Sequence, residues 1–202
     1  MRFTPEVLNR LKLYMLNRQK VTIKGKNGLG QPFRVEGLIP EKISENQVGI
    51  TDNCVYLFFG YYDEESGVRK RLYTPFYVGD FTEPFKLYIE KIYSAGESST
   101  LFYNPNFHDE ILPLVEESKK KYDISNLDKD EKTFSECIGR VVEYEGKKAP
   151  LVATCKVNGK MAVALQPPKT NLRVTLRIIT APIRVLPLPR LMLNLGRDLF
   201  GL

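Results

Sequence analysis

The sequence is poor in the residue types from which many enzymes build catalytic and metal sites. It has no tryptophan, one histidine (His108) and three cysteines, Cys54, Cys137 and Cys155. Nucleophilic machinery of the Ser-His-Asp or Cys-His kind would depend on that single histidine. The cysteines have neither zinc-site spacing nor the even number of a disulfide framework. We therefore expect no enzymatic activity, no metal and no cofactor, and we expect the cysteines to be small buried apolar groups in a reducing compartment.

Long hydrophobic runs are absent as well. The chain has no uninterrupted apolar stretch of about 18 residues or more, the length that a membrane-spanning helix needs. Its first residues contain neither an apolar core nor a small-residue cleavage site of the kind that signal peptides have. We expect a protein without a membrane span, not secreted through a signal peptide, and located in the cytoplasm or in a virion.

Acidic residues are missing from one long part of the sequence. No Asp or Glu occurs between Glu145 and Asp198, although ten Lys and Arg lie there. Residues 1–132 carry 19 Lys and Arg against 20 Asp and Glu, whereas residues 133–202 carry 11 against 4. Such a field attracts nucleic acid, an anionic surface or an acidic protein, but it also fits a basic face that only keeps the protein soluble.

Two groups of basic residues are candidate contacts for nucleic acid. They are Arg69, Lys70 and Arg71 in the first half, and Lys156, Lys160, Arg173 and Arg177 in the last third. The first group adjoins a segment crowded with aromatic residues at 54–81, and aromatics beside basic side chains are typical of barrels that bind single strands. Consecutive aromatics such as Phe58 and Phe59 fill both faces of a strand, so at least half of them belong to the core by this pattern.

Two short patterns suggest chemistry but have simpler explanations. Gly25–Gly30 is glycine-rich, yet it leads into a strand and meets neither phosphate-loop pattern, so we expect a hairpin turn. Glu143–Lys147, with Asp128 and Asp130 upstream, resembles the core of the PD-(D/E)xK nucleases, in which two carboxylates hold a divalent ion beside a lysine. The usual Pro-Asp pair is missing, and we expect a polar strand end that runs into a loop.

The first half of the chain has the pattern of a helix followed by short strands. Thr4-Pro5-Glu6 is a helix start, and apolar residues at helical spacing continue to near Lys20. Strands are predicted at 21–25, 32–39, 48–50, 54–62 and 68–78. In architecture this order resembles the start of small barrels of the Sm, SH3 or OB kind.

The second half is mixed. We predict a short buried helix at 84–93 and a second helix at 107–122, with Asn106 as its cap. Strands are predicted at 140–145, 151–157, 161–166 and 172–178, and the Asn158-Gly159 pair predicts a two-residue hairpin. The fold class is therefore α+β and β-rich: an N-terminal helix, a small antiparallel barrel or meander, a helical middle, and a second small β-sheet. The predicted parts are 1–122, a linker at 123–132, a basic β piece at 133–180, and an extended arm at 181–202.

The arm is the most informative segment. Prolines at 182, 187 and 189 exclude a continuous helix, and arginines recur every six or seven residues among the leucines. The predicted docking residues are Ile183, Arg184, Leu186, Leu188, Arg190, Leu191, Leu193, Leu195, Arg197 and Phe200. Left exposed, these apolar side chains would form a sticky patch, so the arm either packs on its own core, docks into another subunit, or lies on a membrane surface.

We expect a non-enzymatic structural or interaction subunit of a larger multi-protein assembly, homo- or hetero-oligomeric, that docks onto other protein subunits through this arm. A virion or phage-tail component fits this description. The alternative is a nucleic-acid-binding small β-barrel protein that uses the basic C-terminal third.

Overall fold

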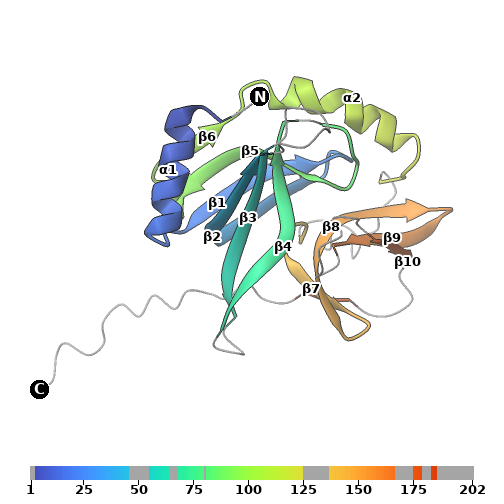
Figure 1. Ribbon diagram of the computed structural model, residues 1–202. Helices are drawn as coiled ribbons and strands as arrows, with labels where there is room; N and C mark the ends of the chain where they lie inside the picture. Colours follow the sequence, from blue (N-terminus) through green and yellow to red (C-terminus); the bar gives the residue numbers. More distant parts are fainter. Residues whose placement is uncertain are drawn as a thin grey trace, which may run out of the picture.

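The fold is mixed α+β and rich in strands, as the sequence predicts. The computed structural model describes residues 3–45, 55–63, 68–79, 81–124, 137–166, 175–178 and 183–185. These residues form two α-helices, two β-sheets and a short 3-10 turn at Ala95–Glu97. Figure 1 shows α1 beside the first sheet, α2 above it and the second sheet next to it.

Six strands make the first sheet, which curls into a partial barrel. They are β1 (Val21–Asn27), β2 (Pro32–Glu45), β3 (Val55–Asp63), β4 (Val68–Val78), β5 (Leu87–Ser94) and β6 (Thr100–Tyr103). The strands from β1 to β4 pair antiparallel in order, and β5 pairs antiparallel with β1. A two-residue parallel pairing of Phe76–Tyr77 with Leu87–Tyr88 joins β4 to β5. The predicted barrel or meander is thus a curled sheet that is not purely antiparallel.

The helix that the sequence predicts at 84–93 is wrong: most of this segment is strand β5. One edge of β5 pairs with β1 along its whole length, and the other edge meets β4 first and then β6. Ile89 and Ile92 enter the main core, while Tyr88 is buried on the side of α2. Because both faces of β5 are covered, its apolar residues do not alternate, and the sequence pattern looks helical.

Helix α1 (Pro5–Leu16) begins where the sequence predicts. The Thr4 hydroxyl accepts a hydrogen bond from the Val7 N–H at 3.3 Å, and Pro5 occupies the first turn. Leu11, a residue of this helix, is fully buried. The helix stops four residues before Lys20, because the chain turns at Arg18 with a φ of 51°.

The second sheet has the strand order β10-β9-β8-β7-β11. Its strands are β7 (Val141–Tyr144), β8 (Lys147–Val157), β9 (Lys160–Leu165), β10 (Thr175–Ile178) and β11 (Ile183–Val185). The predicted hairpin at Asn158-Gly159 is confirmed, with φ values of 52° and 74°. Glu145-Gly146 forms a second two-residue turn, with φ values of 50° and 70°. Strand β11 was not predicted; it fits between Pro182 and Pro187 because it is short and lies at the sheet edge.

The two sheets are joined by one hydrophobic core and by buried amides. Core side chains from β1, β2, β4 and β5 pack continuously with those of β7, β8 and β9. At the β1–β2 turn, the Asn27 amide donates to the Val152 carbonyl at 3.0 Å, and the Gln31 amide donates to the Thr154 carbonyl at 2.7 Å. Two polar side chains of the first sheet are therefore hydrogen-bonded directly to the backbone of β8.

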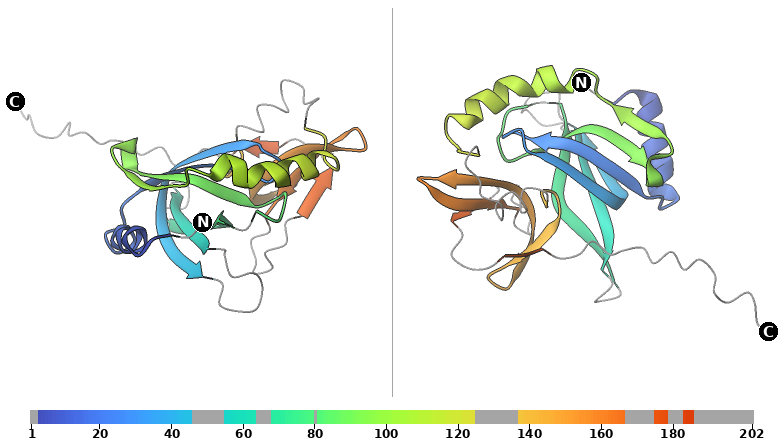
Figure 2. Two further views of the ribbon diagram at one scale, coloured as in Figure 1. Left: turned by 90° about the horizontal axis from the view of Figure 1, so that it is seen from above. Right: turned by 180° about the vertical axis from the view of Figure 1, so that it is seen from behind.

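Helix α2 (Phe107–Lys119) agrees with the helix predicted at 107–122, and Pro113 lies in its second turn. The helix runs from above the first sheet towards the second (Figure 2). Ile111, Leu114 and Val115 pack on Tyr77 and Tyr88 in a smaller second cluster.

The predicted cap of α2 is wrong in one detail. The Asn106 side chain makes no capping hydrogen bond. Asn104 organises the start of the helix instead: its carbonyl oxygen accepts from the Asn106 N–H at 3.1 Å, and its amide donates to Glu110 at 2.8 Å. The Asn104 side chain thus fixes the chain entering the helix through the Asn106 N–H and Glu110.

Some predictions lie wholly or mostly outside the described residues. They are the strand at 48–50, the linker at 123–132 beyond Ile124, and the arm beyond Val185. The proposed domain boundaries stay a prediction. Neither of the two described helices is long and apolar enough to cross a membrane.

Candidate partner-binding site

The described start of the predicted arm is strand β11, which pairs with the edge of β7. In β7, Val142 and Tyr144 are buried in the core, while Val141 and Glu143 are partly exposed on the other face. Strand β11 pairs antiparallel with β7, so that Ile183 lies opposite Tyr144, Arg184 opposite Glu143, and Val185 opposite Val142. An arginine and a glutamate are therefore directly opposed across the two strands, a favourable cross-strand arrangement.

The structure places two of the ten predicted docking residues. Ile183 and Arg184 lie in β11 and pair with the chain's own sheet. The other docking residues lie outside the described part of the chain; they are Leu186, Leu188, Arg190, Leu191, Leu193, Leu195, Arg197 and Phe200. The segment available for a partner thus begins at residue 186, five residues later than the predicted start at residue 181.

The predicted nucleic-acid contacts are not gathered in one place. Arg69, Lys70 and Arg71 lie on β4 near the β3–β4 hairpin, opposite Tyr62, Tyr61 and Gly60. Lys156 and Lys160 flank the β8–β9 hairpin, and Arg177 lies on β10 opposite Val163. Figures 1 and 2 show these two hairpins pointing away from each other. Arg173 lies outside the described residues.

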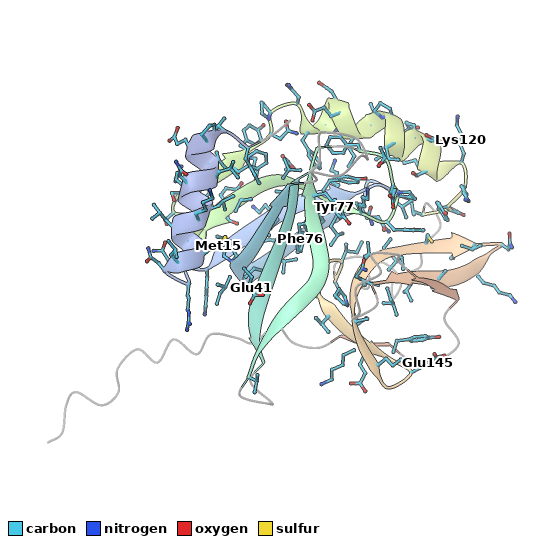
Figure 3. The ribbon with its side chains drawn as sticks, in the orientation of Figure 1. Met15, Glu41, Phe76, Tyr77, Lys120 and Glu145 are labelled. Carbon is cyan, nitrogen blue, oxygen red and sulfur yellow. The ribbon has the colours of Figure 1, made fainter. Side chains whose placement is uncertain are left out.

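Three lysines at the end of α2, which were not among the predicted nucleic-acid contacts, lie near Lys156. Asp123 and Lys156 exchange two backbone hydrogen bonds, of 3.3 and 2.6 Å, which bring the end of α2 against β8. Lys119, Lys120 and Lys121 are exposed there, and Lys119 is paired with Glu116 at 3.0 Å. The sequence pattern explains these lysines as favourable charges at a helix C-terminus. Only the contact of Asp123 with β8 shows that they lie near Lys156, a member of the second basic group. Figure 3 shows Lys120 at this end and Glu145 well away from it at the β7–β8 turn.

A second charged cluster lies on the first sheet and carries both signs. Glu97 binds Lys24 at 3.2 Å and Arg34 at 2.5 Å, and Arg34 also binds Glu36 at 2.6 Å. The hydrogen bond to Glu36, followed by the negative charges of Glu36 and Glu97, raises the pKa of the Arg34 guanidinium despite some desolvation. Partly exposed pairs like these contribute little stability each. The cluster is neutral overall and does not resemble an anion site.

Of the candidate catalytic residues, the structure describes Glu145 and His108, which lie on different elements. Glu145 occupies the β7–β8 turn and His108 is exposed in the first turn of α2, while Asp128 and Asp130 lie outside the described residues. Within the described ranges no group of three His, Cys, Asp or Glu residues could hold a metal ion. The pattern that resembles the nucleases is thus a hairpin turn in its described part.

The cysteines that the structure describes behave as the sequence predicts. Cys137 and Cys155 are both buried. Burial raises the pKa of the Cys155 thiol to about 11, so the nucleophilic thiolate is scarce at neutral pH. Both side chains pack in the common core as small apolar groups. The aromatic residues Phe76 and Tyr77 are also buried, so they cannot stack on bases.

No protein-family model, no curated protein and no solved structure matches this chain.

Proposed function

We propose that the chain is a non-enzymatic structural subunit of a larger multi-protein assembly, which it enters by docking the segment after Val185 onto a neighbouring subunit. A virion or phage-tail component fits this role, as does a cytoplasmic assembly. The observation that carries the proposal is the position of β11, the last strand of its sheet in the described part of the chain. A segment that follows such a strand starts at the surface of the subunit, at an edge where it can reach a neighbour.

The composition of residues 186–202 supports docking. Burying each of its leucines would contribute roughly 1.5–3 kcal/mol before the cost of ordering. Pro187 and Pro189 restrict the unbound chain, so less entropy is lost when the segment orders in an extended form. Arg190 and Arg197 are spaced seven residues apart, which suits contacts with an acidic rim that set the register.

Ending the chain after Val185 is expected to abolish assembly with little effect on folding. The shortened chain keeps β11 and the described core, so its melting temperature should fall by no more than roughly 2–4 °C, which corresponds to about 1 kcal/mol. Sedimentation velocity of both chains, alone and with proteins that co-purify with the full chain, would measure assembly, and thermal unfolding would measure stability.

A second truncation, after Ala181, serves as the matched control. It also removes β11 and uncovers the β7 edge, so it should lower the melting temperature further. If the cut after Val185 already costs many degrees while assembly persists, the segment belongs to the chain's own core and the proposal is wrong.

Nucleic-acid binding is the second candidate, and the lysine cluster at the end of α2 favours it. If Lys120 and Lys160 contact phosphates, the double variant Lys120→Gln/Lys160→Gln should bind single-stranded DNA and RNA more weakly. The slope of log affinity against log salt should become shallower by about 0.7–0.9 for each lost contact.

The matched control is Lys12→Gln on α1, which removes an exposed charge at the other side of the first sheet. Fluorescence anisotropy over a salt series would compare the three proteins. Equal slopes in all three, or no binding by the unmodified chain, would remove this candidate.

A further inference from the structure

The edge of β7 that faces away from β8 can pair with an extended strand. β7 is four residues long; β8 covers one edge at all four positions, and β11 covers the other edge at three. Val142 and Tyr144 hold β7 in place from the core side, with exposed fractions of 0% and 3%. The edge that β11 occupies is therefore rigidly presented by the folded subunit.

The acceptor edge is specific for the sequence that fills it. Glu143 lies on the outer face of β7, at the position that opposes Arg184. A slip of one residue would place Ile183 or Val185 opposite Glu143 and move Arg184 to the face of Val142 and Tyr144. Charge complementarity and strand periodicity thus select the order Ile-Arg-Val in one register.

Strand β11 is held on the edge of β7 by few contacts. Three paired positions provide only a few backbone hydrogen bonds, each worth about 0.5–1.5 kcal/mol net. Pro182 precedes β11 and residues 186–202 follow it. An identical strand from another copy would make the same contacts with the same edge, so exchange between copies needs no new complementarity.

We propose that the β7 edge accepts Ile183–Val185 from a second copy of this chain, so that exchange of β11 links subunits. This inference rests on the proposed function, because the exchanged strand carries the docking segment 186–202 to the neighbour. It goes further by naming the neighbour as a copy of the same chain and the contact as an antiparallel β7–β11 pairing between copies.

Cysteine trapping tests the exchange in the full chain. Glu143→Cys and Arg184→Cys variants, each in a chain with Cys54→Ser and with tags of different size, would be co-expressed and oxidised with oxidised glutathione. Directly opposed residues of antiparallel strands have Cα atoms about 4.5–5.5 Å apart, within disulfide range. Exchange predicts a disulfide-linked heterodimer of the two tags as the major oxidised product. The buried Cys137 and Cys155 thiols should contribute little background.

Two controls sharpen the result. Lys148→Cys replaces Glu143→Cys in the first, because Lys148 lies opposite Glu143 on β8, one strand further from β11, and should not cross-link with Arg184→Cys. In the second, Glu143→Cys and Arg184→Cys are combined in one chain. A closed monomer from this double variant, with no heterodimer from the separate variants, would overturn the exchange.

Failure of the exchange and failure of the proposed function have different signatures. If trapping fails while the chain ended after Val185 still cannot assemble, the docking segment binds another kind of partner and only the exchange is wrong. If trapping succeeds but the shortened chain still assembles normally, exchange of the retained β11 links the subunits without residues 186–202, and the docking role proposed for that segment is wrong.

Discussion

Replacing Gly25 by alanine should destabilise the protein by more than about 4 kcal/mol or prevent folding. A Cβ at this position would lie 1.8 Å from the Tyr88 carbonyl oxygen and 2.8 Å from the Phe33 ring. Gly25 sits in the middle of β1, where the pairing with β5 shifts register. Because β1 is paired with β2 on one edge and β5 on the other, its backbone cannot move away without breaking one of the two pairings.

Gly37→Asn is the matched comparison in the neighbouring strand. Gly37 has a φ of 71° and no atom within 4 Å of an added Cβ, and asparagine tolerates this left-handed conformation better than most residues. The Gly37→Asn substitution should lower the free energy of unfolding by about 1 kcal/mol or less. Urea unfolding followed by circular dichroism would give both values, and similar costs for the two variants would contradict the close approach of β1 to β5.

Replacing Asn27 by alanine is expected to cost about 3–5 kcal/mol, since the side chain is fully buried and makes four hydrogen bonds. Its oxygen accepts from the N–H groups of Leu29 and Gln31 at 3.1 and 3.0 Å, which shapes the β1–β2 turn. Its amide donates to Gln31 and to the Val152 carbonyl, both at 3.0 Å. The alanine variant would leave these partners unsatisfied in the interior.

Thr154→Val provides the control in the same cluster. It removes the hydroxyl that accepts from the Gln31 amide at 3.0 Å, but the same amide still donates to the Thr154 carbonyl at 2.7 Å. We expect a loss of about 1 kcal/mol, and hydrogen exchange should show faster opening of β8 in the Asn27 variant only. If the Asn27 variant were no less stable than Thr154→Val, the buried amides would not be the main polar link between the sheets.

Elements whose signals are local could be predicted from the sequence. Thr4-Pro5 starts α1, and Asn158-Gly159 makes the β8–β9 hairpin, because a capping hydroxyl and a tolerated positive φ act within a few residues. The strands at 68–78 and 151–157 were also predictable, since their length and β-branched or aromatic content are those of strands. For the site, the sequence showed where basic and apolar residues gather, but not which of them are neighbours.

Elements that depend on distant partners could not be predicted, because long-range contacts form them. β5 is a strand because β1, β4 and β6 pair along its edges, and β11 exists because β7 offers a free edge to three residues between prolines. The Asp123–Lys156 bridge gathers lysines from α2 and β8 that are far apart in sequence. By its sequence Asn27 is a turn residue, but in the structure its amide also donates a hydrogen bond to the Val152 carbonyl, 125 positions away. In each case the stabilising contact lies across the fold, and a local pattern carries no information about it.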